Sequence, residues 1–194
     1  MSTAARIRPA STADLPLLQE IERAASRLFG ALGMTVVAED EPDSIATLTS
    51  YREAGRAWVR TDERDRPVAY LLDGVVDDCA HVDQVTVHPD AARRGLGRQL
   101  IEHLAERAHA DGLPALTLTT FVEVPWNAPY YQRCGFRVLG EAELTEGLRR
   151  VRRAEAERGL DAWPRVAMRR VHGSVSLSPR SAAVPSCGDT SAAE

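Results

Sequence analysis

Two glycines and three arginines form the segment with the clearest chemical signal. They lie in the run Arg93-Arg94-Gly95-Leu96-Gly97-Arg98, between a strand-like and a helix-like stretch. Backbone N–H groups at a helix start are unpaired, and the helix dipole makes that end electropositive. Glycine lets a phosphate approach those amides closely, and arginine adds positive charge. The pattern predicts a phosphate-binding loop; the alternative interpretation is a tight strand-to-helix turn with solvated arginines.

Two other phosphate-binding motifs do not fit this loop. A Walker loop needs Gly-Lys-[Ser/Thr], which is absent, and the dinucleotide pattern Gly-x-Gly-x-x-Gly fails because Leu100 stands at its third glycine. A protein that uses the loop to bind ATP is therefore a weaker hypothesis.

The loop resembles a known family motif. Val85-Thr86-Val87-His88-Pro89, followed by Ala92 and the run above, is similar to the acetyl-CoA-binding motif of the GNAT acetyltransferase superfamily, [Gln/Arg]-x-x-Gly-x-[Gly/Ala]. Both glycines match, whereas Ala92 departs at the first position, which concerns one side-chain contact because the family uses mainly backbone amides there. Residues 127–136 resemble the family segment that ends in Tyr-x-x-x-Gly-Phe. The two motifs stand in the family's order, and the resemblance covers roughly residues 6–171.

The resemblance implies a fold and an activity. The fold is α/β (α+β): a GNAT-like single domain with a central mixed, mostly antiparallel sheet of six to seven strands, flanked by helices. Its sheet splays between strands 4 and 5, here 81–88 and 115–120. The activity is that of an N-acetyltransferase, which moves an acetyl group from acetyl-CoA, a co-substrate, to a primary amine by direct transfer in a ternary complex. The alternative function is a non-catalytic acyl-CoA-binding regulatory module.

The same resemblance assigns the cofactor contacts. Pantetheine is expected between the splayed strands, where the N–H of Val85 could also polarise the thioester carbonyl. Asn127 is expected to hydrogen-bond the pantetheine arm, with a simple helix cap as its alternative role. The expected cofactor-binding residues are Val85, Thr86, Val87, Arg93, Arg94, Gly95, Leu96, Gly97, Arg98 and Asn127.

Three residues are the catalytic candidates. Tyr131 aligns with the family tyrosine that protonates the departing thiolate, and a phenol with a pKa of about 10 can donate to it; its alternative role is packing beside Phe136. A base is needed because an alkyl amine with a pKa of ~10 is only about one part in a thousand neutral at pH 7. Asp83 and His81 are the candidates, and strand alternation predicts that they face the same side as Val85. Asp83 could instead hydrogen-bond the substrate or a loop.

Five other residues are weaker candidates for the site. Gln84 stands where several relatives have a carboxylate, and an amide cannot serve as a base. Glu20 and Glu22 lie in a helical region that often forms a wall of the acceptor pocket in this family, but a solvated helix face is the favoured interpretation. Trp126 and Phe121 flank the site, and core packing explains them at least as well.

Hydrophobic periodicity and turn residues predict the elements that position these groups. We expect a first helix that is capped by Ser11 or Thr12, has Asp14 in its first turn and runs to about Arg27, and further helices at 42–54, 96–110, 127–133 and 144–158. We expect strands at 5–10, 57–60, 67–72, 81–88, 115–120, 136–139 and 165–171. Residues 1–171 are predicted to form the acetyltransferase domain. Residues 172–194 contain few bulky apolar side chains, which predicts a disordered C-terminal tail.

Composition limits the partners. The net charge is -4, which argues against nucleic acid, and no run reaches the roughly 18 apolar residues of a membrane-spanning helix. The N-terminus lacks the apolar block of a signal peptide, so we expect a cytoplasmic protein without membrane association. The three cysteines show no zinc-site spacing, and no metal is expected. The expected partner is a small-molecule or peptide amine; edge strands and the charged segment 144–158 also permit a homodimer.

Overall fold

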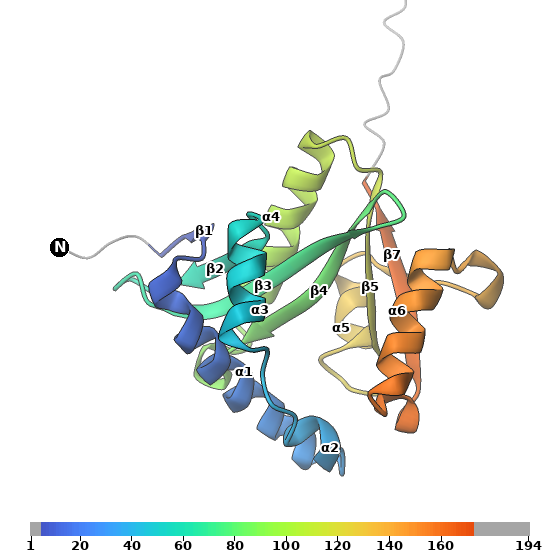
Figure 1. Cartoon of the computed structure of the whole chain (residues 1–194), viewed down its shortest axis with the longest axis horizontal. Helices are drawn as coiled ribbons and strands as arrows, with labels where there is room; N and C mark the ends of the chain where they lie inside the picture. Colours follow the sequence, from blue (N-terminus) through green and yellow to red (C-terminus); the bar gives the residue numbers. More distant parts are fainter. Residues whose placement is uncertain (1–4, 173–194) are drawn as a thin grey trace, which may run out of the picture.

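The structure, a computed structural model, describes residues 5–172. Within this range seven strands form one mixed sheet in the order β1-β2-β3-β4-β5-β7-β6 (Figure 1). The strands are β1 (Ile7–Pro9), β2 (Ala57–Thr61), β3 (Pro67–Val76), β4 (Cys79–Val87), β5 (Ala115–Phe121), β6 (Arg137–Val138) and β7 (Arg165–Val171). Neighbouring strands are antiparallel except β4 and β5, which are parallel. The expected mixed, mostly antiparallel sheet is confirmed.

Helices cover both faces of this sheet. The helices of the described range are α1 (Leu15–Gly30), α2 (Thr35–Ala38), α3 (Ile45–Glu53), α4 (Leu96–Ala110), α5 (Ala128–Arg133) and α6 (Glu146–Glu157). Short 3-10 turns are η1 (Thr12–Asp14), η2 (Pro89–Ala91), η3 (Glu141–Glu143) and η4 (Leu160–Ala162). Helices α4 and α5 lie behind the sheet in Figure 1, whereas α1, α3 and α6 lie in front of it. His172 still donates to the Pro114 carbonyl at 3.3 Å, and the rest of the expected tail lies outside the described residues.

The two faces have separate apolar cores. Leu100 and Leu104 of α4, spaced one turn apart, pack on Leu71 and Leu116 of the sheet. On the other face, α1 and α3 pack their apolar residues on Val59, Tyr70 and Leu72. Burial of each large side chain stabilises the fold by about 1.5–3 kcal/mol. Helices therefore hold the sheet on both of its faces, on either side of the place where β4 and β5 separate.

The separation of β4 from β5 begins in the middle of β4. The two strands pair only from Ala80 opposite Leu116 to Val82 opposite Leu118. Strand β5 remains paired with β7 along its whole length, while β4 runs away from it (Figure 1). Residues 83–87 thus have no described strand on the side that faces β5. The expected splay between the fourth and fifth strands is confirmed.

A β-bulge lies at the point of separation. Leu72 of β3 pairs with Gln84, but the next residue, Asp73, pairs with Val82. Asp83 is therefore an extra residue without a partner on β3. A bulge of this kind bends its strand and shifts the alternation of side chains by one residue.

The bulge corrects one expectation about β4. Four side chains pack on the same α4 core, two before the bulge and two after it: Ala80, Val82, Val85 and Val87. The prediction that His81 and Asp83 share a face with Val85 was wrong, because strict alternation does not count the extra residue. His81 lies beside Thr117, on the opposite face of the sheet.

The hairpin between β3 and β4 is longer than the sequence indicated. Strand β3 continues to Val76 and β4 begins at Cys79, whereas the expected strands ended at 72 and began at 81. The two turn residues, Asp77 and Asp78, have φ values of 46° and 58°. Aspartate tolerates this left-handed backbone, which a two-residue hairpin requires. The Asp77 carboxylate also accepts the Gly147 N–H at 2.8 Å, which ties the hairpin to α6.

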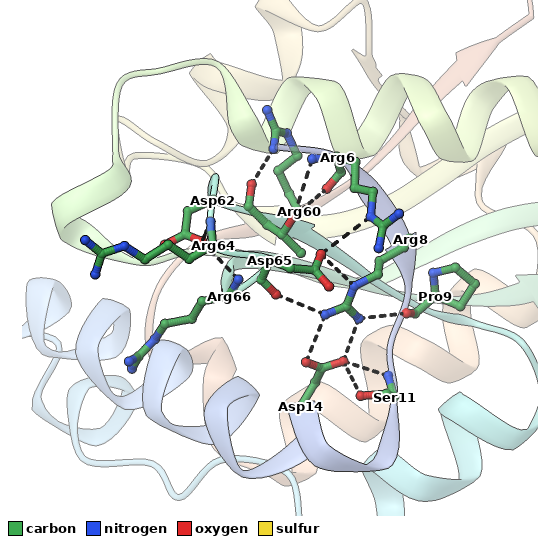
Figure 2. Close-up of polar contacts among 11 residues, drawn as sticks. Arg6, Arg8, Pro9, Ser11, Asp14, Arg60, Asp62, Arg64, Asp65 and Arg66 are labelled. Carbon is green, nitrogen blue, oxygen red and sulfur yellow. Dashed lines mark hydrogen bonds and ion pairs between the residues drawn. The ribbon is translucent and has the colours of Figure 1, made fainter. Parts of the chain in front are cut away.

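Ion pairs hold the short first strand in place (Figure 2). The Arg8 guanidinium donates to Asp14 at 2.7 and 3.2 Å and to the Asp65 carboxylate at 3.2 Å. Asp14 also accepts the Ser11 N–H and hydroxyl, each at 2.7 Å. Although burial opposes it, the hydrogen bonds from Arg8 and Ser11 lower the pKa of Asp14. This network joins β1 to the start of α1 and to the β2–β3 turn, so α1 is fixed where it crosses the sheet.

Candidate active site

The loop before α4 twice enters the left-handed backbone region. Arg93 has a φ of 60° and Gly95, the N-cap of α4, a φ of 74°. No described residue offers a hydrogen-bond acceptor to the N–H groups of 93–98, and the first paired amide is that of Gln99, which donates to the Gly95 carbonyl at 3.0 Å. Consecutive free amides in such a turn, at the positive end of a helix, bind anions.

The charge of this loop is not neutralised within the described chain. Arg93 and Arg94 are exposed and no described carboxylate pairs with them. Arg98 lies 3.8 Å from Glu102, but Glu102 is held more closely by Arg170, at 2.6 Å. Arg170 is also the main cause of the lowered pKa of Glu102. The loop therefore presents both amides and cations to a ligand with several negative charges.

Three elements meet at Gly97. A Cβ built at this position would lie 3.0 Å from the Tyr130 hydroxyl of α5 and 3.5 Å from a Val87 methyl group of β4. The anion-binding loop, the open part of β4 and α5 are thus adjacent. Leu96 is buried beside them in the α4 core. A linear ligand could run from the loop along β4 into the gap beside β5.

The open stretch of β4 offers different groups on its two faces. Val85 and Val87 pack toward α4, while the Thr86 hydroxyl accepts from the Gln84 amide at 3.3 Å on the other face. The backbone edge of 83–87 that faces β5 lacks a strand partner among the described residues. An extended amide-bearing ligand could pair with this edge as an added strand.

Helix α5 places Asn127 and Tyr131 at the other side of the gap. Asn127 occupies the N-cap position, but its side chain makes no capping hydrogen bond. The Tyr131 ring is partly buried and packs edge-on against Phe136, with ring centroids 6.0 Å apart. Burial raises the pKa of the Tyr131 phenol, so it is a neutral donor at pH 7. Both roles named for Tyr131, packing and proton donation, are compatible with this position.

His81 lies at the vertex where β4 and β5 begin to separate. Its side chain is buried, and Nδ1 is 2.8 Å from the Thr117 hydroxyl. Burial lowers the pKa of His81 to about 4, and the charge of Glu155 opposes this only in part. The imidazole is therefore neutral at pH 7 and shielded from solvent.

Asp83, the bulged residue, leans toward β3 rather than toward the gap. A Cβ built at Gly74 of β3 would lie 2.8 Å from its Oδ2. Tyr51 of α3 hydrogen-bonds the carboxylate, while desolvation raises the pKa of Asp83 overall. Asp83 lines a hollow of about 730 Å³ between α3 and β3, together with Ser50, Tyr51, Asp73 and Gly74.

A ring of polar side chains joins α1 to the open stretch of β4. The Tyr70 hydroxyl donates to Glu22 Oε2 at 2.9 Å. Gln84 also hydrogen-bonds the Glu22 carboxylate, and Thr86 hydrogen-bonds Tyr70. Glu22 is not the solvated residue that the sequence favoured. A signal was present, because Glu22 lies one turn after Leu18 and next to Ile21, at the border of the buried face of α1.

Glu155 forms a partly buried charge cluster, at the α6 side of the gap. Arg165 donates to it at 2.7 and 3.2 Å, Arg152 donates at 2.6 Å, and the Thr119 hydroxyl also hydrogen-bonds it. Although burial opposes ionisation, these partners lower the pKa of Glu155. Glu155 is a fixed anion that holds β5, β7 and α6 together.

Two kinds of feature are absent from residues 5–172. No helix there is long and apolar enough to cross a membrane. No group of three or more His, Cys, Asp or Glu side chains in this range is arranged to hold a metal ion.

Comparison with known proteins assigns this arrangement to a family. Residues 17–136 match the sequence model of the Acetyltransferase (GNAT) family. The chain is 33% identical over 90 residues to the peptidyl-lysine N-acetyltransferase YjaB of Escherichia coli (strain K12), which is 46% of this chain and 54% of that protein. It is 29% identical over 126 residues to the [ribosomal protein bS18]-alanine N-acetyltransferase of Salmonella typhimurium, 65% of this chain and 76% of that protein. The chain spans about half the length of the YjaB proteins that it matches.

Solved structures show the same fold. The PaiA N-acetyltransferase of Thermoplasma acidophilum in complex with coenzyme A superposes with a TM-score of 0.64 and 13% identity, over 88% of this chain and 100% of that chain. The ribosomal-protein-S18-alanine N-acetyltransferase of Escherichia coli superposes with a TM-score of 0.58 and 24% identity, over 86% and 92% of the two chains.

Proposed function

Because the chain belongs to the acetyltransferase (GNAT) family, we propose that it is an N-acetyltransferase that moves the acetyl group of acetyl-CoA directly to a primary amine. The observation that carries this proposal is the loop 93–98, whose free amides, with Arg93 and Arg94 unpaired among the described residues, lie beside the opening between β4 and β5. A phosphate cradle next to an open strand edge fits a ligand with a pyrophosphate at one end and an amide-bearing arm.

The proposed binding mode follows the shape of the site. The pyrophosphate lies against the amides of Gly95, Leu96 and Gly97, with Arg93, Arg94 and Arg98 around it. The pantetheine arm runs along Val85, Thr86 and Val87, and the free side chain of Asn127 is available to its amides. Gly97 supports this path, because any larger residue there would press on Tyr130 and Val87, where the two parts of the ligand meet.

Tyr131 is the proposed proton donor to the leaving sulfur. Acetyl transfer breaks the carbon–sulfur bond and leaves a thiolate, which takes a proton more readily from a nearby neutral phenol than from bulk water at pH 7. The raised pKa keeps Tyr131 protonated until that moment. Tyr130 lies with its hydroxyl on the first turn of α4, so it is the less suitable donor.

The acceptor side is negatively charged, which supports a cationic amine as the second substrate. Glu22, Asp43 and Asp83 lie on the face of the sheet that α1 and α3 cover. Relatives are named for acceptors on proteins, a peptidyl lysine and the alanine of ribosomal protein bS18, and one for the small molecule S-(2-succino)cysteine. We propose a peptide or small-molecule amine as acceptor, a cytoplasmic location, and no nucleic-acid partner; a homodimer stays a prediction.

Thiol release with a panel of amines tests the proposal. The panel contains a lysine peptide, a peptide with N-terminal alanine, an S-substituted cysteine and an alkyl diamine, each mixed with acetyl-CoA. The chain contains no lysine, so any acetyl-lysine detected by mass spectrometry comes from the acceptor and not from the enzyme. We expect amine-dependent thiol release with at least one acceptor. Binding of acetyl-CoA with no turnover on any amine would favour the alternative, a non-catalytic acyl-CoA-binding module.

A further inference from the structure

Three carboxylates lie around the separation of β4 from β5: Glu22 beside Gln84, Asp83 on β4 itself, and Glu155 beside Thr119 of β5. The proposed transfer needs one group that accepts a proton, because an alkyl ammonium with a pKa of ~10 has no free electron pair for attack. Such a base must be near the open part of β4, accessible to the acceptor, and not already committed to fixed cations. The three carboxylates differ in these respects.

Glu155 is committed to other groups. Arg152, Arg165 and Thr119 occupy its oxygens, and the Arg165 side chain is only 8% exposed. A carboxylate held by two guanidinium groups has low proton affinity, which agrees with its lowered pKa. Protonation of Glu155 would also leave a buried arginine charge without its full partner. Glu155 is therefore a structural anion.

Asp83 and His81 are less well placed than the sequence indicated. Asp83 Oδ2 lies against Gly74 of β3, on the side of β4 opposite to β5, and its carboxylate is bonded by Tyr51. His81 is 2% exposed at the closed vertex, with Nδ1 on Thr117. A role for either as base stays a prediction, but the Asp83 carboxylate lies toward β3 and His81 lies at the closed end of the gap.

Glu22 meets the geometric requirements. Helix α1 crosses the sheet in front of β3 and β4 (Figure 1). From this helix, Glu22 reaches Tyr70 of β3 and Gln84 of β4. Gln84 and Thr86, which complete the polar ring, both belong to the stretch of β4 that has lost its β5 partner. The carboxylate is thus held by neutral donors beside the gap, and no arginine among residues 5–172 pairs with it.

The groups around Glu22 also set its proton affinity. The ionisable neighbours that face it are Tyr70 from β3 and Asp43 from the segment before α3, while β4 contributes the neutral Gln84. Desolvation is the main cause that raises the pKa of Glu22, and the charge of Asp43 adds to it. The hydrogen bonds from Gln84 and Tyr70 act in the opposite direction. A carboxylate with raised proton affinity and no fixed cation is suited to accept a proton and release it again.

We propose that Glu22 is the catalytic base, which takes one proton from the acceptor's ammonium nitrogen directly or through one water. The nitrogen–hydrogen bond breaks, the electron pair stays on nitrogen, and the new carbon–nitrogen bond forms as the carbon–sulfur bond breaks. The ammonium loses two protons in all: one leaves through Glu22 to solvent, and the other replaces the proton that Tyr131 gives to the sulfur. Tyr70 and Gln84 are positioning residues. The inference rests on the proposed acetyl transfer.

The pH dependence of Glu22→Gln tests this role. The probe is the panel amine that wild type acetylates with the highest kcat/KM. Glu20→Gln is the matched control, because Glu20 lies two residues earlier on α1 and is exposed. We expect Glu22→Gln to lower kcat/KM at pH 7 by about 100-fold or more, the usual range for a general base, and Glu20→Gln to change it less than about threefold.

A structural defect would not reproduce the shape of the profile. In wild type, kcat/KM should fall at acid pH as Glu22 is protonated. In Glu22→Gln the reaction uses only amine that is already neutral, so kcat/KM should rise about tenfold per pH unit from pH 7 to pH 9 for an alkyl amine. Tyr70→Phe removes a hydrogen bond that lowers the pKa of Glu22, so the acidic limb should move to higher pH.

Acetyl-CoA titration separates the possible failures. Glu22→Gln should bind acetyl-CoA as wild type does, since Glu22 lies on the acceptor face. Unchanged kcat/KM and an unchanged acidic limb in Glu22→Gln would overturn the role of Glu22 while leaving acetyl transfer intact. A wild type that binds acetyl-CoA but acetylates no panel amine would also overturn it. A wild type that does not bind acetyl-CoA would contradict the proposed function itself.

Discussion

The Tyr130 hydroxyl lies 3.0 Å from the point where a Cβ would stand at Gly97. This contact brings the first turn of α4, which completes the anion-binding loop, against α5, which carries Tyr131. Few real Cβ atoms make so close a contact, so glycine permits the two elements to meet without displacement. The phosphate end and the reactive end of the proposed ligand are thereby fixed relative to each other.

Gly97→Ala should therefore weaken acetyl-CoA binding about three- to tenfold by pushing Tyr130 aside, which is ~1 kcal/mol. Tyr130→Phe removes the hydroxyl and should recover part of the loss in the double variant. Gly30→Ala is the control, because the Cβ there would meet its nearest neighbour at an ordinary 3.7 Å. Equal Kd values for Gly97→Ala and wild type by calorimetry would show that the contact has no bearing on the cradle.

Tyr131→Phe should lower kcat by about 100-fold or more and leave the Kd of acetyl-CoA within about twofold, because it removes a proton donor and little volume. Tyr130→Phe is the control and should retain most of the turnover. Stopped-flow or steady-state thiol release measures both. Full activity in Tyr131→Phe would assign the ring to packing beside Phe136 alone.

His81 should make the fold sensitive to acid. Its pKa is lowered to about 4 by burial, so the unfolded chain binds a proton more readily than the native protein does. The stability that the neutral, buried His81 contributes is fully present above about pH 6.5, the pKa of histidine in the unfolded chain. It is lost as the pH falls toward 4, by about 3 kcal/mol in all.

The measurement is the free energy of unfolding of wild type and His81→Gln between pH 7.5 and 4. The difference between the two removes the effect of other titrating groups. Wild type should lose about 3 kcal/mol relative to His81→Gln over this range. A difference that does not change with pH would contradict a buried, neutral His81.

Glu155→Gln should destabilise the protein by about 3–5 kcal/mol, because it leaves the largely buried Arg165 without an anion and removes one of the two carboxylates that pair with Arg152. Glu157→Gln changes an exposed glutamate of the same helix and should have almost no effect. Urea unfolding measures both. Equal stabilities would mean that the Glu155 network contributes no more than a surface ion pair.

The arrangement of elements was largely predictable from sequence. Leu100 and Leu104 one turn apart, with Gly95 before them, mark α4, and alternating apolar residues mark β4 and β5. The bulge at Asp83 was not predictable, because it depends on how β3 pairs with β4 and not on any local residue preference. One unpaired residue was enough to move His81 and Asp83 away from the face of Val85.

The candidate site was predictable to the extent that it is local in sequence. The loop 93–98 and the segment around Tyr131 are continuous motifs. The ring of Glu22, Tyr70 and Gln84 comes from a helix and two strands, and Glu22 and Tyr70 are 48 positions apart in the sequence. No local pattern shows that these side chains meet; the sequence indicated only that Glu22 lies at the border of the buried face of α1.

Calorimetric titration with acetyl-CoA tests the central claim, that the loop before α4 is a pyrophosphate cradle. Gly95→Glu places a negative charge at the N-cap of α4, and Gly112→Glu places the same charge at its other end. The two glycines have nearly equal φ values, 74° and 76°, so the backbone strain is matched. We predict micromolar binding to wild type and to Gly112→Glu, and at least a tenfold loss, about 1.4 kcal/mol, for Gly95→Glu. No binding to wild type, or equal binding to both variants, would contradict the account.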